Sequence, residues 1–366
     1  MTAPRLVVDL EKVGHNARTL VDRLAPRGIS VVGVTKASLG LPALATTLVD
    51  AGVAALGDSR VENLRRLRRA GVTAPTLLVR SPMMSQADRV VAVADVSCNT
   101  EADVLAALSA AAVVGRRPHG VVLMVELGDR REGILVADVE GMAAEVLRLP
   151  GLELRGVGAN LACQSGVVPD DRNMGELSRL ADRLDARFGV ALDVVSGGNS
   201  ANLGWALGTT NVGRVNQLRL GESILLGRDP LDRSPIEGLH LDAFTLVAEV
   251  IESKDKPSTP RGSTGQTAFG PRSVQPDRGT IRQVIVALGE QDTDPAGLTP
   301  PPGLSVLGAS SDHLVLDAGD LRPVAGDEVR FGVDYAALLR AMTSPFVAVG
   351  EAVPARATGV AGAASS

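Results

Sequence analysis

Between residues 30 and 227 the sequence repeats one pattern eight times: a short apolar run is followed by a stretch with amphipathic helical spacing. Alternation of this kind indicates βα units, whose strands pair in parallel. Eight such units form a TIM-type (β/α)8 barrel. The runs are Val31–Val34, Val53–Leu56, Thr76–Val79, Val93–Cys98, Gly120–Leu127, Leu154–Gly158, Leu192–Val195 and Gln217–Leu220. We therefore predict an α/β fold with a barrel over residues 12–235.

After the barrel the pattern changes to apolar runs separated by Pro- and Gly-rich turns, which predicts a C-terminal β domain over residues 236–352. The N-terminal strand 5–10 is a candidate to join this domain. Two stretches, 254–279 and 291–303, are expected to lack regular structure. The Ala- and Gly-rich end, residues 353–366, is expected to be a disordered tail. The β-domain runs are Phe244–Ile251, Thr280–Leu288, Leu304–Leu307, His313–Leu316 and Glu328–Phe331.

Composition excludes several classes of protein. With 45% hydrophobic and 22% charged residues the chain is a folded globular protein, and its net charge of −5 argues against a nucleic-acid partner. No apolar run approaches the roughly 18 residues of a membrane span, and the N-terminus does not resemble a signal peptide. We expect a cytoplasmic protein without a membrane partner. The two cysteines, Cys98 and Cys163, form neither a disulfide framework nor a CxxC metal pair, so no metal site is expected.

Polar residues follow nearly every predicted barrel strand, at the barrel edge that carries the chemistry of this fold. Lys36, one of only four lysines, follows the first run. Partial burial there would lower the pKa of its amine toward the range of a nucleophile or base, although a solvated surface lysine is the alternative. The segment 196–200, Ser-Gly-Gly-Asn-Ser, follows the seventh run, and its backbone N–H groups and hydroxyls suit an anion. A lysine and a phosphate site together suggest pyridoxal 5′-phosphate held as a Schiff base, with Arg219 facing its pyridine nitrogen.

Seven longer segments resemble the alanine/ornithine racemase family of fold-type III pyridoxal-phosphate enzymes, and are most similar to the ornithine racemases within it. They are GDSRVENLRRL at 57–67, NTEAD at 99–103, VELGDRREG at 125–133, GVGANLAC at 156–163, VSGGNSANL at 195–203, LRLGESILLGR at 218–228 and LGASSDHLVLD at 307–317. The resemblance covers residues 5 to about 350. It implies an alanine racemase-like barrel and β domain, and an isomerase that removes the α-proton of an amino acid on one face and returns it on the other. It also implies a small amino-acid substrate, ornithine above all, and a head-to-tail homodimer.

The resemblance also implies site residues. Lys36 resembles the Schiff-base lysine, and Arg131 resembles the arginine near the phenolic oxygen of the cofactor. Tyr335 resembles a C-terminal tyrosine that reaches the phosphate. The full expected cofactor-binding set is Lys36, Arg131, Asn160, Ser196, Asn199, Ser200, Arg219, Gly221, Glu222 and Tyr335.

One departure concerns the second catalytic base. In alanine racemase this base is a tyrosine from the β domain of the partner subunit, but Tyr335 is the single tyrosine of this chain. We predict Asp312 and His313 as the base, with Asp292 next, because a group that titrates near neutral pH suits α-proton exchange. Lys36 serving both faces is the alternative, and both Asp312 and His313 are equally compatible with purely structural roles.

Two other functions share this fold. A metal-assisted lyase like D-threonine aldolase or D-serine dehydratase would use His313 as a metal ligand, but one histidine makes a weak site. A non-catalytic pyridoxal-phosphate carrier protein would lack the added β domain. Within the racemase reading, a diamino acid would require an acidic contact, for which Glu222, Asp129 and Asp292 are candidates.

Overall fold

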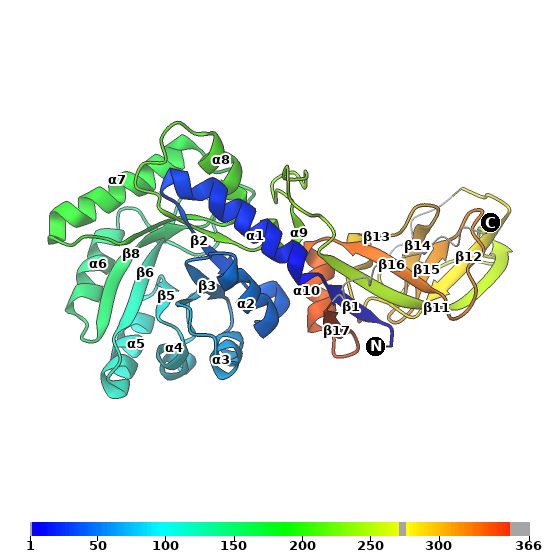
Figure 1. Ribbon diagram of the computed structural model, residues 1–366, viewed down its shortest axis with the longest axis horizontal. Coiled ribbons are helices and arrows are strands. Elements are labelled where there is room, and N and C mark those ends of the chain that lie inside the picture. Colours follow the sequence, from blue (N-terminus) through cyan, green and yellow to red (C-terminus); the bar gives the residue numbers. More distant parts are fainter. Residues whose placement is uncertain (1, 271–275, 352–366) are drawn as a thin grey trace, which may run out of the picture.

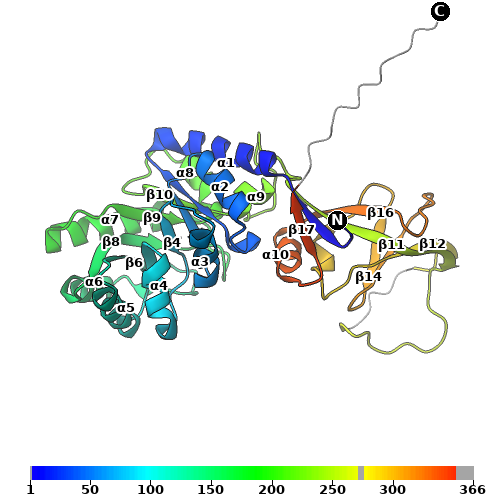
Figure 2. The ribbon, with the colours of Figure 1, turned by 60° about the horizontal axis from the view of Figure 1, so that its bottom comes forward.

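The computed structural model describes residues 2–270 and 276–351, so the predicted tail at 353–366 lies outside the described residues. These residues form a barrel and an antiparallel sheet that lie side by side (Figure 1). Helix α1 (Leu10–Leu24) runs along the barrel toward the sheet, and α10 (Tyr335–Thr343) lies between the two parts. Figure 2 shows the same division from a second direction.

Within the described residues, eight parallel strands close the barrel, as the alternation of strands and helices predicts. Pairing of Leu218 with Val31 joins the last strand to the first, and pairing of Val96 with Gly120 completes the circuit. A short strand, β7 (Ile134–Leu135), adds to β6. The barrel strands are β2 (Ser30–Val34), β3 (Ala55–Asp58), β4 (Thr76–Leu78), β5 (Val96–Asn99), β6 (His119–Glu126), β8 (Leu152–Ala159), β9 (Val194–Gly198) and β10 (Gln217–Leu220).

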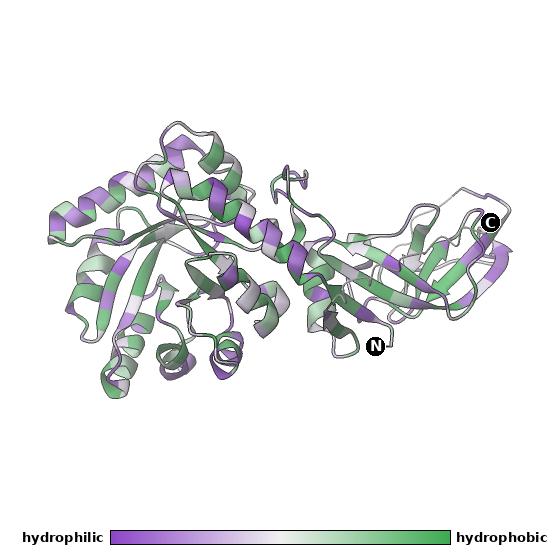
Figure 3. Cartoon of the chain, in the orientation of Figure 1, coloured by the Kyte–Doolittle hydropathy of each residue, from purple (hydrophilic) through white to green (hydrophobic). Residues whose placement is uncertain are grey.

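The outer helices form because each has an apolar face that packs against the strands. In α7 the buried residues recur every three or four positions, from Met174 to Leu184, and hydrophilic and hydrophobic residues alternate along it (Figure 3). A capping box between Asp170 and Asn173 begins this helix, and Gly189 ends it with a φ of 64°. The other barrel helices are α2 (Pro42–Asp50), α3 (Val61–Arg69), α4 (Ala87–Val93), α5 (Ala102–Gly115), α6 (Val139–Arg148), α8 (Leu203–Gly208) and α9 (Glu222–Leu226).

The antiparallel sheet includes both ends of the described chain. The N-terminal strand β1 (Arg5–Val8) pairs antiparallel with β11 (Phe244–Pro257) and parallel with β17 (Ala348–Glu351). The remaining order is β13-β16-β11-β12-β15-β14. These strands are β12 (Thr280–Val286), β13 (Leu298–Thr299), β14 (Ser305–Ala309), β15 (Leu314–Asp317) and β16 (Glu328–Val333).

The structure corrects two expectations about irregular segments. Strand β11 continues to Pro257, because residues 254–257 pair with residues 280–283 of β12 although three of them are charged. The second segment contains the 3-10 helix η5 (Pro295–Gly297) and β13. In both segments, backbone hydrogen bonds form regular structure that the hydrophobicity of the side chains does not predict.

Within residues 2–270 and 276–351, no helix combines the length and the apolarity that are needed to cross a bilayer.

Candidate active site

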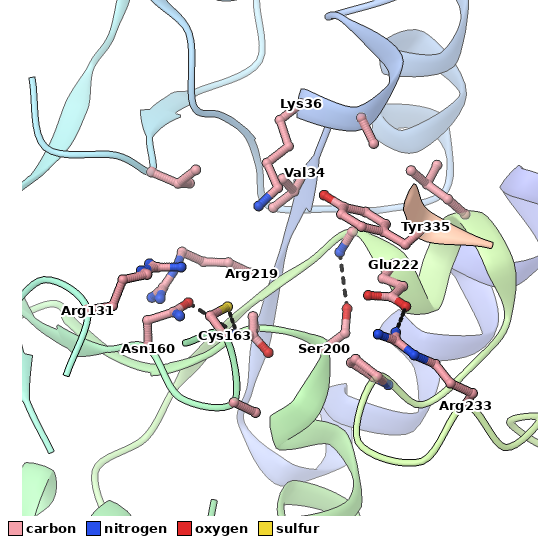
Figure 4. Close-up of a pocket in the computed structure, with 17 residues that line it drawn as sticks. Val34, Lys36, Arg131, Asn160, Cys163, Ser200, Arg219, Glu222, Arg233 and Tyr335 are labelled. Atoms are coloured by element: carbon pink, nitrogen blue, oxygen red, sulfur yellow. Dashed lines mark hydrogen bonds and ion pairs between the residues drawn. The ribbon is translucent and has the colours of Figure 1, made fainter. Parts of the chain in front are cut away.

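A cavity of about 250 Å³ lies at the C-terminal ends of the barrel strands, where the barrel meets α10. Its walls come from segments that follow β2, β6, β8 and β9, from β10 and α9, and from the first residue of α10. Figure 4 shows these side chains converging on one space. Catalytic residues of TIM-type barrels lie at this edge.

Lys36 begins the 3-10 helix η2 (Lys36–Ser38) directly after β2, and its amine reaches into the cavity (Figure 4). The preceding residue, Thr35, is fixed by a 2.7 Å hydrogen bond that its hydroxyl donates to the buried Asp58 carboxylate. Burial lowers the pKa of the Lys36 amine below its ordinary value of 10.5 and outweighs the opposing charge of Cys163. A larger neutral fraction of the amine favours its use as a nucleophile or a base.

Hydrogen-bond donors gather where β9 and β10 end. Ser200 is buried and begins the 3-10 helix η4 (Ser200–Asn202). Its oxygen accepts hydrogen bonds from the backbone N–H of Gly221 at 3.3 Å and from the backbone N–H of Ser223 at 3.2 Å. Tyr335 reaches the same side of the cavity from α10, and burial raises its pKa to about 12, so its hydroxyl stays protonated. These donors suit a phosphate, which TIM-type barrels commonly bind after strands 7 and 8.

Arg219 supplies a buried cation on β10. One of its N–H groups donates to the Ala159 carbonyl over 2.7 Å, and another donates to the Ser196 hydroxyl. Burial lowers the pKa of the guanidinium below its ordinary value, but an arginine side chain remains charged in proteins. Two hydrogen bonds therefore fix a permanent positive charge in the cavity wall.

A hydrogen-bonded cluster connects the ends of β6, β8 and β9. The Asn199 amide donates to the Leu161 carbonyl at 2.9 Å and to the Asn160 oxygen at 3.2 Å. When the side-chain amide of Asn160 is rotated by half a turn, its oxygen instead accepts a hydrogen bond from Arg131 at 3.2 Å. The orientation of a side-chain amide is assigned from its hydrogen-bond partners. Burial disfavours the charge of Arg131, but its ion pair with Glu132 raises the pKa of the guanidinium.

The charges that line the cavity are unbalanced. Among the described lining residues four are basic, namely Lys36, Arg131, Arg219 and Arg233, and one is acidic, Glu222. Glu222 forms an ion pair with Arg233. Burial raises the pKa of the Glu222 carboxyl, and the charge of Arg233 opposes this effect. The excess of positive charge suits an anionic ligand.

Comparison with known proteins identifies the family. The alanine racemase N-terminal domain matches residues 8–229. The chain belongs to the alanine racemase family. A lysine racemase from Thermotoga maritima is 40% identical over 350 residues, which is 95% of this chain and 98% of that protein. An ornithine racemase from Acetoanaerobium sticklandii is 36% identical over 348 residues, 94% of this chain and 98% of that protein. The prediction of an isomerase of the racemase type is confirmed.

The fold of an alanine racemase also matches. The structure of alanine racemase from Streptomyces coelicolor A3(2) superposes with a TM-score of 0.75 at 20% identity, over 95% of this chain and 97% of that one. At this identity the match shows the fold, a barrel followed by an antiparallel sheet. The fold predicted from the sequence is confirmed.

Of the residues expected to bind the cofactor, all but Ser196 line the cavity of this family member. Ser196 was assigned to the phosphate loop. In the structure its hydroxyl accepts a hydrogen bond from Arg219 and lies outside the lining. Ser196 therefore positions the arginine.

The three predicted bases do not line the cavity of this chain. Asp292 is buried and accepts hydrogen bonds from the Gly289 N–H at 3.0 Å and the Ser344 hydroxyl at 3.4 Å, so its carboxylate holds a turn. Asp312 and His313 are joined by a 2.8 Å hydrogen bond at the turn between β14 and β15, where both side chains are exposed.

Two cavity features were not predicted. Arg233 adds a cation from the segment after α9, and Cys163 contributes a thiol after β8. Asp129 was considered as a substrate contact, but its carboxylate is buried and accepts hydrogen bonds from backbone N–H groups of residues 163–167. Proximity in the fold, rather than a local motif, creates each of these roles.

Proposed function

We propose that the chain is a pyridoxal 5′-phosphate-dependent racemase for an amino acid whose side chain carries a second amine, the class that includes ornithine and lysine. One observation carries the proposal: a lysine amine of lowered pKa, a cluster of anion donors and a buried arginine line one cavity. A lysine racemase and an ornithine racemase are two relatives that match nearly the whole chain.

The donor set fits this cofactor. Its phosphate would accept hydrogen bonds from Ser200, Tyr335 and the N–H group of Gly221. Lys36 would hold its carbonyl carbon covalently. The excess of positive charge around the cavity would offset the negative charge of the phosphate.

Pyridoxal phosphate supplies an electron sink that acidifies the α-hydrogen of an amino acid bonded to it. Lys36 then acts as a base on one face of the α-carbon, because its lowered pKa leaves more of the amine unprotonated near neutral pH. Arg219 would keep the ring nitrogen unprotonated, since a fixed cation disfavours a second positive charge beside it. A weaker electron sink restrains side reactions, which suits an enzyme that only moves a proton.

Glu222 is our candidate for the side-chain ammonium of the substrate. Of the three acidic residues considered from the sequence, Asp129 and Asp292 are buried and occupied by hydrogen bonds within the protein. Glu222 lines the cavity and has one partner there, the more exposed Arg233. A substrate ammonium can share this carboxylate, which has room for several donors.

The resemblance further implies a head-to-tail homodimer in which the β domain of one copy covers the cavity of the other. The turns at residues 289–292 and 310–313 are adjacent, since the Glu290 N–H donates to the Ser310 carbonyl at 3.0 Å, and Gln291 and residues 311–313 are exposed there. These turns would face the partner. A cytoplasmic location stays a prediction.

The test is direct. Purified protein is incubated with pyridoxal phosphate, reduced with borohydride and digested, and mass spectrometry locates the modified lysine. Chiral chromatography then follows L- and D-ornithine, lysine, alanine and serine. We expect modification of Lys36 and faster racemisation of ornithine and lysine. Modification elsewhere, or no racemisation of any of these amino acids, would overturn the proposal.

A further inference from the structure

Among the described residues of the cavity wall, Cys163 is a titratable group without a role in the proposed function. It follows β8 by a few residues, lines the cavity and is an exposed free thiol. The second cysteine, Cys98, is buried inside the barrel with Val122 and Met124. The two cysteines therefore have different surroundings.

The segment that carries Cys163 is held by hydrogen bonds from its backbone to a single carboxylate. The buried Asp129 carboxylate accepts hydrogen bonds from four backbone N–H groups: those of Cys163 at 3.1 Å, Gln164 at 2.9 Å, Ser165 at 3.1 Å and Val167 at 3.4 Å. Burial disfavours this carboxylate, but the four donors hold its pKa below the ordinary range. Successive N–H groups around one anion fix the path of a loop.

Backbone strain is also present next to the thiol. Ala162 has a φ of 58°, in the left-handed region that residues with a Cβ rarely adopt. Such strain persists where the surrounding structure enforces it, and it clusters at functional sites. Here it turns the chain so that both Ala162 and Cys163 line the cavity.

The sulfur atom of Cys163 also accepts a hydrogen bond. The Asn199 amide donates to Cys163 Sγ at 3.3 Å, and the same amide donates to the Leu161 carbonyl. Asn199 also accepts from the Ala201 N–H at 2.8 Å, which places it beside Ser200. The thiol is therefore positioned by a residue that also organises the anion donors.

Cys163 and Lys36 approach the cavity from opposite sides. In Figure 4 the lysine descends from η2, whereas the thiol rises from the segment after β8. The other candidates are unsuitable for proton transfer near neutral pH. Tyr335 has a pKa of about 12, and Glu222 is paired with Arg233. Cysteine is one of the side chains that serve as general acids and bases in enzymes.

We propose that Cys163 is the second proton-transfer residue of the racemase, acting on the face of the α-carbon opposite Lys36. The inference rests on the proposed function. With one enantiomer the thiolate takes the α-proton and becomes a thiol, while the electron pair of the C–H bond stays with the substrate. The Lys36 ammonium then gives a proton to the other face, and the pair forms the new C–H bond. The reverse reaction exchanges the two roles, and nothing is oxidised or reduced.

The central experiment measures α-hydrogen exchange in D2O for each enantiomer of ornithine by NMR. In Cys163→Ala, racemisation should fall by about 10²–10⁴-fold. Exchange should persist with one enantiomer, because Lys36 still serves its face, and should be lost with the other. Cys163→Ser provides a second variant of nearly native shape, and Cys98→Ala controls for removal of a thiol outside the cavity.

A second readout does not depend on turnover. Iodoacetamide should alkylate Cys163 in the folded, cofactor-loaded protein, detected in the tryptic peptide 156–172, and bound ornithine should slow this labelling. Cys98 should stay unlabelled, because it is buried.

Two results would overturn the proposal. Cys163→Ala protein that racemises at the wild-type rate would place the second base elsewhere, such as Asp312 and His313 of another copy. Loss of exchange with both enantiomers, in a variant that still binds the cofactor, would show that the thiol does not serve one face. Wild-type protein that exchanges no α-hydrogen would refute the proposed function itself, and this assignment with it.

Discussion

Acid should destabilise the barrel through a histidine far from the chemistry. His119 is fully buried at the start of β6, and its Nε2 lies 2.7 Å from Ser97 Oγ. Burial lowers the pKa of the imidazole from 6.5 to about 4. The folded protein therefore keeps His119 neutral at a pH where the unfolded chain has already bound a proton.

The sign and size of the effect follow from this difference. As the pH falls from 6.5 to about 4, the unfolded state holds more protons, so the free energy of unfolding decreases. Each pH unit is worth about 1.4 kcal/mol, which gives about 3 kcal/mol over the interval. This is a large part of the roughly 5–15 kcal/mol that stabilises a typical domain.

The assay is urea unfolding followed by the fluorescence of Trp205, the single tryptophan of the chain, which lies on barrel helix α8. Wild-type protein and His119→Gln are compared at pH 7, 5 and 4, since the glutamine amide can reach the place of Nε2. The wild type should lose about 3 kcal/mol more than the variant between pH 7 and 4. His15→Asn, on the exposed side of α1, controls for the loss of a histidine. Equal losses in wild type and His119→Gln would refute the reasoning, as would an NMR titration of His119 near pH 6.5.

Four further outcomes are expected. Lys36→Ala should abolish the visible absorbance of lysine-bound pyridoxal phosphate, and an absorbance band that survives without added amine would show that another lysine carries the cofactor. Arg219→Glu should slow racemisation and increase side transamination, measured as keto acid released, because a carboxylate favours protonation of the ring nitrogen; normal racemisation would place Arg219 away from that nitrogen. Glu222→Gln should lower kcat/KM for ornithine by about 10- to 100-fold, the effect of a charged hydrogen bond worth about 1.5–3 kcal/mol, and should leave alanine unaffected; equal losses for both would refute the substrate contact. Asp312→Asn/His313→Asn should keep racemase activity within about threefold, by chiral chromatography, because neither residue lines the cavity; a loss of about 100-fold or more would place the base in the β domain.

The barrel was predictable because its strands are apolar and its helices amphipathic, so local periodicity marks each element. β10 coincides with the predicted run Gln217–Leu220. The end of β11 was not predictable in this way, because Lys254 and Asp255 are charged and owe their order to pairing with β12. The hydrophobicity of a single segment does not show whether that segment pairs with a distant strand.

The site divides along similar lines. That Lys36 and Ser200 lie in one cavity was predictable because both follow predicted strands, and strand ends meet at one edge of a barrel. Cys163 was missed because its place depends on the left-handed turn at Ala162 and on the distant Asp129 carboxylate. Neither contact has a local motif. Ser196 contacts Arg219 rather than lining the cavity, because residues of one loop share a sequence motif but point in different directions.

The pairing of β1 has a consequence for how the polypeptide folds as it leaves the ribosome. Leu6 pairs with Leu246 and with Val349, so β1 is synthesised well before either of its partner strands. At about 5–20 residues per second, Leu246 follows Leu6 after about 10–50 s, and Val349 follows later still. During that delay the barrel strands emerge and can pair with their neighbours, while β1 waits. Tyr335 arrives in the same late segment that completes the sheet, so a nascent chain would present Lys36 well before it could close the cavity around a phosphate.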